Sequence, residues 1–223
     1  MKPLFDQTGY TAINRNIAYN VEPESWPLCW NHLKRALALQ TPHSRNNANT
    51  YTELEQQIQR FYAQLQQTPE FTENVRAINT SPRNNNPWLG QELFNDGHME
   101  VSLNVYFNEA VTPIHDRSRR VEAFIVLSGQ ARVQHFSILP SPIESHYPIV
   151  KLRRDECENL ERHQLCLLHS GFNSVHEITA LSGRCVVLRL SIYDVTARTL
   201  PCWYFPISSQ HNEEFFTQRV KQF

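Results

Sequence analysis

The segment from Thr112 to Gly129, TPIHDRSRRVEAFIVLSG, constrains the fold of this chain more than any other stretch. His115 and Arg117 are two residues apart, so on a strand their side chains would share one face. After a polar stretch, the apolar run from Val121 to Leu127 is typical of a returning strand and carries Glu122 near its start. The spacing therefore predicts two strands that direct His115 and Glu122 toward the same place, with a glycine turn after the second strand.

The part of the chain that follows residue 87 contains many short apolar runs separated by turn residues. Runs typical of strands lie at residues 100–107, 111–116, 121–127, 131–138, 149–153, 164–168, 175–179 and 184–193. We also predict an acidic turn at residues 155–158 and a short helix at the C-terminal end. Short strands at this regular spacing predict an all-β barrel or jelly roll, because an α/β fold would alternate strands with helices.

The first 80 residues have a different pattern. Apolar residues recur at helical spacing over residues 25–40 and 50–65, and a third, shorter helix is predicted over residues 69–78. The segment SPRNNNP then breaks this pattern with prolines and asparagines. We therefore predict a helical N-terminal region, residues 1–80, packed on a β-barrel with a C-terminal extension, residues 81–223, as one structural unit.

Composition narrows the class of partner. The chain has 223 residues, a net charge of -1 and a pI near 6.8, and it lacks a basic tract, so we expect no nucleic-acid partner. No apolar run approaches the roughly 20 residues of a membrane span, and we expect a cytoplasmic protein without a membrane partner.

The five cysteines show no C-x-x-C pair, which favours buried thiols. We expect a small-molecule substrate, and a monomer or homodimer.

A candidate metal site emerges from three residues. His176 lies in HSGFNSVHEI, where a turn leads into a strand. With His115 and Glu122 it predicts a face of two histidines and one carboxylate, which binds non-haem Fe(II) with positions open for oxygen and substrate. The combined spacing favours metal binding by His115 and His176, whereas an ion pair with Arg117 would be an alternative use of Glu122. Fe(II) is the expected metal, with another divalent metal as the alternative.

Arg117 permits two interpretations. It cannot be a metal ligand, because a guanidinium stays protonated in a protein. If its side chain faces the same pocket as His115, it would bind a substrate carboxylate or phosphate through two parallel hydrogen bonds. Otherwise it turns outward with Arg119 and Arg120 as a solvated basic turn.

These spacings resemble the motifs of the cupin superfamily. The order of residues from His115 to Gly129 is similar to its first motif, with Arg117 in place of a second histidine, and GFNSVHEI is similar to its second motif. Residues 88–204 further resemble the cysteine dioxygenase (thiol dioxygenase) group through QELFNDG, TPIHDR, GFNSVHEI and RLSIYD. The resemblance implies a mainly β fold, the cupin double-stranded β-helix or jelly-roll barrel, preceded by a helical N-terminal region.

The same resemblance implies roles for further residues. A pocket tyrosine of the group corresponds to Tyr193, which would hydrogen-bond to bound oxygen or substrate. Arg189 and Ser191 occupy the positions that orient this tyrosine, and Gln91 occupies the position that distinguishes substrates within the group. We therefore expect Arg117, Gln91 and Arg189 to contact substrate, and Tyr193 and Arg117 to act in catalysis.

Two functions of different classes remain open. The group binds iron through three histidines, two of which correspond to His115 and His176. The favoured function is a non-haem oxygenase, a dioxygenase in which His115, Glu122 and His176 bind Fe(II). It would act with O2 on a small polar or thiol-bearing substrate. The alternative is a non-catalytic cupin that binds a small anionic ligand, with Arg117 paired to Glu122.

Overall fold

The computed structural model describes residues 48–80, 87–95, 99–107, 109–116, 120–140, 149–168, 175–193, 202–208 and 212–221. The helices are α2 (Ala48–Leu65) and α3 (Pro69–Thr80). The strands are β1 (Trp88–Asn95), β2 (Met99–Phe107), β3 (Ile114–Asp116), β4 (Arg120–Ser128), β5 (Ala131–Leu139), β6 (Ile149–Leu160), β7 (Leu165–Leu168), β8 (Val175–Ala180), β9 (Arg184–Tyr193), β10 (Cys202–Pro206) and β11 (Glu214–Lys221). The helix expected over residues 25–40 lies outside the described residues.

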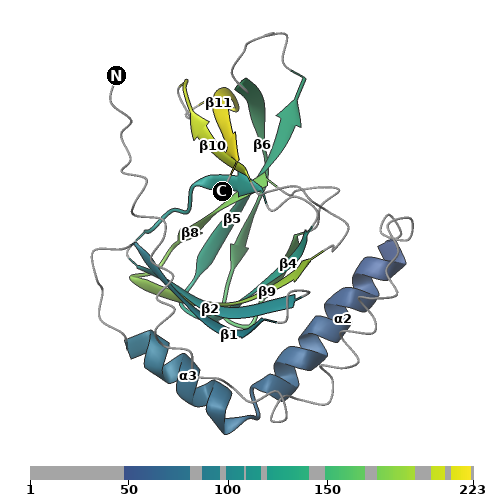
Figure 1. Cartoon of the computed structure of the whole chain (residues 1–223), viewed down its shortest axis with the longest axis vertical. Helices are drawn as coiled ribbons and strands as arrows, with labels where there is room; N and C mark the ends of the chain where they lie inside the picture. The colour runs from purple at the N-terminus through teal and green to yellow at the C-terminus, as the bar shows by residue number, and fades with distance from the viewer. Residues whose placement is uncertain are drawn as a thin grey trace.

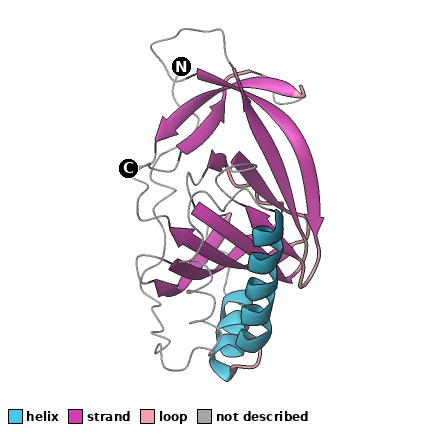
Figure 2. Cartoon of the chain, turned by 90° about the vertical axis from the view of Figure 1, so that its right-hand side faces the viewer, coloured by secondary structure: helices cyan, strands magenta, loops and turns pink. Residues whose placement is uncertain are grey.

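Both described helices form where the apolar spacing predicted them. The buried face of α2 includes Leu54, Ile58, Phe61, Tyr62 and Leu65. α3 begins at Pro69, whose fixed φ suits the first helical turn. Together the helices cover one sheet, as Figures 1 and 2 show, and share a core cluster with it. Neither of these two helices is long and apolar enough to cross a membrane.

The strands form two antiparallel sheets. One sheet has five strands in the order β1-β2-β9-β4-β7, and the other closes on itself in the order β10-β11-β6-β5-β8-β3 (Figure 1). The strand that carries His115 and the strand that carries Glu122 belong to different sheets. This mainly β architecture, with its helices on the N-terminal side, confirms the predicted jelly-roll fold class.

Alternation along the strands divides the side chains of the five-stranded sheet between two cores. On β4, Val121, Ala123 and Ile125 pack with the helices. Phe124 and Val126 point the other way and pack with residues of the closed sheet. The second of these cores fills the space between the two sheets, which we call the barrel interior.

The structure corrects two local predictions. The acidic turn expected at residues 155–158 is part of β6, which continues to Leu160 and resumes regular pairing at Cys157, opposite Gln134, followed by Glu158 opposite Val133. Two residues of β6 stand opposite one residue of β5 at this bulge, and their polar character resembles a turn in the sequence. The C-terminal helix is also wrong, because residues 214–221 form β11 between β6 and β10.

Candidate functional site

Three buried histidines form a row across adjacent strands of the closed sheet. His176 on β8 is the cross-strand partner of His115 on β3 and of His135 on β5. Residues directly opposite each other in a sheet point to the same face, so the three imidazoles share one face. They are 5%, 1% and 1% exposed for His115, His135 and His176. That face is the barrel interior, because the His176 ring lies against Phe124 of the opposite sheet, with centroids 5.7 Å apart.

His115 and His176 lie close enough to act together. Their ring centroids are 4.4 Å apart, with an interplanar angle of 53°. Nδ1 of His115 lies 2.8 Å from the carbonyl oxygen of Pro113, so Nδ1 carries the proton and donates it there. This leaves the lone pair on Nε2, the tautomer that metal-binding histidines adopt when a backbone carbonyl holds the other nitrogen. The Trp203 ring packs on His115 at 5.1 Å.

Glu122 also faces the interior, but its carboxylate has a cationic partner. Oε1 accepts hydrogen bonds from Arg189 Nη2 at 2.7 Å, Arg189 Nε at 3.2 Å and Ser191 Oγ at 3.0 Å. Burial disfavours the charged guanidinium, but the carboxylates of Glu122 and Glu100 outweigh this and raise the pKa of Arg189. The Arg189 guanidinium is therefore charged, and it holds the Glu122 side chain on the β9 side of the interior.

The remaining predicted residues are placed differently. Gln91 is the cross-strand partner of Leu103, which belongs to the core under the helices, and its Nε2 donates to Asn74 Oδ1 on α3 at 2.8 Å. Gln91 therefore faces away from the barrel interior. Arg117 lies outside the described residues. The backbone of Tyr193 pairs with β4, and its side chain lies outside the described atoms.

The structure adds a group that the sequence prediction missed. Ligand atoms of His135, Glu158 and Cys166 lie within 4.8 Å of one another. His135 Nε2 is 2.8 Å from Glu158 Oε1. The alternation of Val133 and His135 in ARVQHFSI was the available signal, since it directs both side chains to one face. Glu158 was missed because its segment was expected to be a turn.

The arrangement of these side chains suits a metal bound by His115 and His176 better than one bound by the predicted triad of His115, Glu122 and His176. His115 and His176 present buried imidazoles side by side, and one of them has its tautomer set for Nε2 coordination. Glu122 would have to turn from Arg189 to become a third ligand. Among the described residues, His115, Glu122 and His176 do not form a trio with ligand atoms within 4.8 Å of one another. Glu122 as a ligand stays a prediction.

Comparison with known proteins gives structural neighbours only. No family model and no curated protein matches this sequence. A cupin superfamily protein from Desulfitobacterium hafniense matches with 16% identity over 51% of this chain and 84% of that chain, with a TM-score of 0.38. KdgF from Halomonas sp. matches with 14% identity over 52% and 86%, with a TM-score of 0.36. Oxalate oxidase in complex with the substrate analogue glycolate matches with 15% identity over 52% and 54%, with a TM-score of 0.35. The structural neighbours thus include proteins of the cupin superfamily.

Proposed function

We propose that the protein is a metal-dependent oxygenase of the cysteine dioxygenase type, with His115 and His176 as the metal ligands. The observation that carries this proposal is the ring contact of these two histidines, with His115 Nδ1 bonded to the Pro113 carbonyl. That hydrogen bond fixes both the orientation and the tautomer of the imidazole, which is how proteins prepare a histidine for a metal. Fe(II) is the expected metal, and when bound it would supply the activation of dioxygen.

The surrounding side chains favour chemistry away from bulk water. Phe124 covers the His176 ring from the opposite sheet, and Trp203 packs on His115. Arg189 and Ser191 hold Glu122 at the edge of the same space, so a polar substrate would meet an anchored carboxylate there. Within this proposal Tyr193 and Arg117 orient the substrate, which by the family resemblance is a small polar or thiol-bearing molecule. Gln91 has no part in it, because its side chain faces α3.

The test is the metal content of anaerobically purified protein, measured by elemental analysis. Wild type should contain iron near one equivalent per chain, or accept it on reconstitution with Fe(II). His176→Ala should lose this iron, and Glu122→Gln decides whether the carboxylate is a third ligand. His163→Ala is a matched control, because it removes an exposed histidine outside the barrel interior. Oxygen uptake with a panel of small thiols and amino acids then tests the oxygenase activity.

Two outcomes would overturn the oxygenase. One is wild type that stays free of iron after reconstitution, and the other is iron that His176→Ala retains in full. Oxygen uptake that no small thiol or amino acid stimulates would remove the proposed substrate class while leaving the metal site in place.

One observation favours a second candidate, a non-catalytic cupin that binds a small anion. The Glu122 carboxylate already accepts three hydrogen bonds from Arg189 and Ser191, and this withdraws it from metal coordination. For this candidate, thermal-shift measurements with a panel of small carboxylates and sulfonates should show stabilisation that His176→Ala retains. Loss of that stabilisation together with loss of iron would return the assignment to the oxygenase.

A further inference from the structure

A separate group of metal-binding side chains lies where the two sheets meet. His135 on β5 and Glu158 on β6 belong to the closed sheet, and Cys166 on β7 belongs to the five-stranded sheet. One ligand atom from each lies within 4.8 Å of the other two. An imidazole nitrogen, a carboxylate oxygen and a thiolate sulfur are the donors that zinc binds in proteins. The three residues therefore form a donor set of the right type at short range.

Hydrogen bonds already draw these side chains together. His135 Nε2 lies 2.8 Å from Glu158 Oε1, and the Cys166 thiol shares a hydrogen bond with the same carboxylate. Nδ1 of His135 is buried and has no hydrogen-bond partner among the described residues, as expected for a neutral imidazole with its proton on Nε2. The imidazole proton of His135 and the thiol proton of Cys166 thus both lie against the Glu158 carboxylate, where a single cation could replace them.

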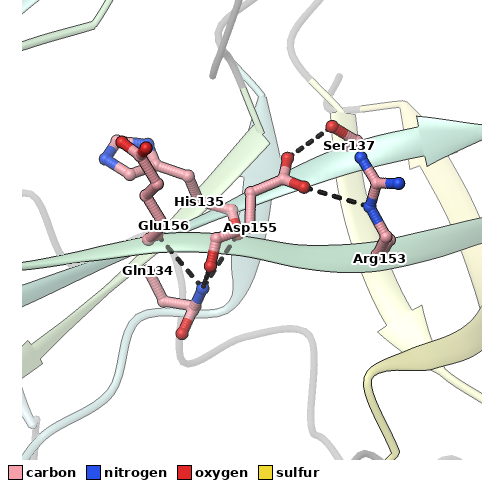
Figure 3. Close-up of polar contacts among 6 residues, drawn as sticks. All are labelled: Gln134, His135, Ser137, Arg153, Asp155 and Glu156. Atoms are coloured by element: carbon pink, nitrogen blue, oxygen red, sulfur yellow. Dashed lines mark hydrogen bonds and ion pairs between the residues drawn. The ribbon is translucent and has the colours of Figure 1, made fainter.

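The bulge in β6 positions Glu158. Gln134 Nε2 donates to the carbonyl oxygens of Asp155 at 3.1 Å and Glu156 at 3.3 Å, and Figure 3 shows these contacts. Arg153 Nε bonds the Asp155 carboxylate at 3.3 Å. These contacts hold the strand immediately before Glu158 and restore its pairing opposite β5. The carboxylate is therefore placed by the backbone and not by a flexible loop.

Glu158 connects the buried part of the group to solvent. The side chain of His135 is 1% exposed, whereas that of Glu158 is 43% exposed. Glu158 also lines a surface cleft together with Glu55 of α2 and His163 of the β6–β7 turn. A cation would enter through this cleft past two carboxylates, and a water molecule from the cleft would supply a fourth ligand.

We propose that His135 Nε2, a carboxylate oxygen of Glu158 and Cys166 Sγ bind one zinc ion that joins the two sheets. Binding moves the imidazole proton from Nε2 to Nδ1 and releases the thiol proton to solvent, so one proton leaves for each zinc bound. This site is independent of the proposed iron site. His135 is the cross-strand partner of His176, but its Nε2 is directed at Glu158.

Cobalt(II) is the probe, because it takes the same donors as zinc and shows thiolate-to-metal charge-transfer absorption when a cysteine binds it. The full chain is stripped of metal, reduced and titrated anaerobically. The thiolate band of wild type should correspond to one bound cobalt per chain, and Zn2+ should displace that cobalt. Cys166→Ala should abolish the band, whereas Cys185→Ala, which removes another buried thiol, should keep it. His176→Ala should also keep it, and this separates the zinc site from the proposed iron site.

A second variant guards against misfolding of Cys166→Ala. Glu158→Gln changes a half-exposed side chain and should weaken cobalt binding at least by the roughly 10- to 100-fold that loss of a supporting partner costs. Three results would overturn the site: no thiolate band in wild type, an unchanged band in Cys166→Ala, or unchanged affinity in Glu158→Gln.

Discussion

Arg189 donates two hydrogen bonds to Oε1 of Glu122 inside the barrel, from Nη2 at 2.7 Å and from Nε at 3.2 Å. Arg189 is 9% exposed and Glu122 is 1% exposed. Two charges buried to this degree are tolerated because each neutralises the other. The carboxylate that was expected to bind metal is thus held by a cation from β9. Glu122 could bind a metal only if it left its hydrogen bonds with Arg189.

Removing only Arg189 should strongly destabilise the fold. Arg189→Met leaves the Glu122 carboxylate buried without its cation, so we expect the free energy of unfolding to fall by about 3–5 kcal/mol in urea titrations. The double variant Glu122→Leu/Arg189→Met should recover most of this loss, because no buried charge remains. Arg132→Met, on the exposed face of β5, is the control and should be near neutral. A stability of Arg189→Met equal to wild type would show that the pair is not buried.

Trp203 should report on metal binding at the histidine pair. Its ring packs on His115 at 5.1 Å, so a paramagnetic ion such as Fe(II) or Co(II) at His115 should quench its fluorescence. We expect anaerobic titration to quench part of the emission of wild type, since the chain has four tryptophans. Trp203→Phe should lose the quenched component while retaining metal. Equal quenching in this variant would place the metal elsewhere.

Tyr62 connects α2 to the turn between β6 and β7 through a hydrogen bond, and this contact should stabilise the fold. Its hydroxyl lies 2.7 Å from Nδ1 of His163 and accepts a hydrogen bond from Gln66 Nε2 at 2.9 Å. Tyr62→Phe removes both contacts, so we expect the free energy of unfolding to fall by about 1 kcal/mol near neutral pH. Gln59→Ala is the control, because Gln59 lies on the exposed side of α2 in the surface cleft that His163 also lines. It should change the free energy of unfolding little.

The contribution of Tyr62 should depend on pH. Burial raises its pKa to about 12, a rise that Arg162 and the bond from Gln66 only partly oppose, whereas the unfolded value is about 10. Between these values the unfolded chain loses the phenol proton and the native protein keeps it, so stability falls as pH rises. The advantage of wild type over Tyr62→Phe should therefore shrink above pH 10. A constant difference between neutral and alkaline unfolding curves would contradict the raised pKa.

Gly129 should not tolerate a side chain. Its φ is +79°, and an added Cβ would collide with the carbonyl oxygen of Arg184 and with Ser182 Oγ. We expect Gly129→Ala to lower the free energy of unfolding by roughly 2 kcal/mol or more, from backbone strain and overpacking. Gly90→Ala is the matched control, because its Cβ would meet only the side-chain end of Asn104 at 3.2 Å. Similar thermal unfolding of both variants would contradict this account.

Periodicity predicted most of the secondary structure, since each pattern reflects a face that had to be buried. The apolar stripe of α2 predicted a helix, and the alternation of β2 predicted a strand. Gly129 follows the end of β4 and has the left-handed φ of a turn glycine. The predictions failed at residues 155–158 and at the C-terminus. At both places a polar or mixed segment becomes a strand only because a neighbouring strand is available to pair with it.

The sequence by itself determined the fold class and predicted that His115 and His176 lie together, because side-chain alternation and turn spacing are local properties of the chain. Only the tertiary structure decided what Glu122 contacts. Its partner Arg189 lies 67 residues away and reaches it through the pairing of β4 with β9. The same holds for His135, Glu158 and Cys166, which come together only where β5, β6 and β7 meet. Alternation within a strand fixes which face of the sheet a side chain takes, but which side chains meet it depends on the pairing of strands that are distant in the chain.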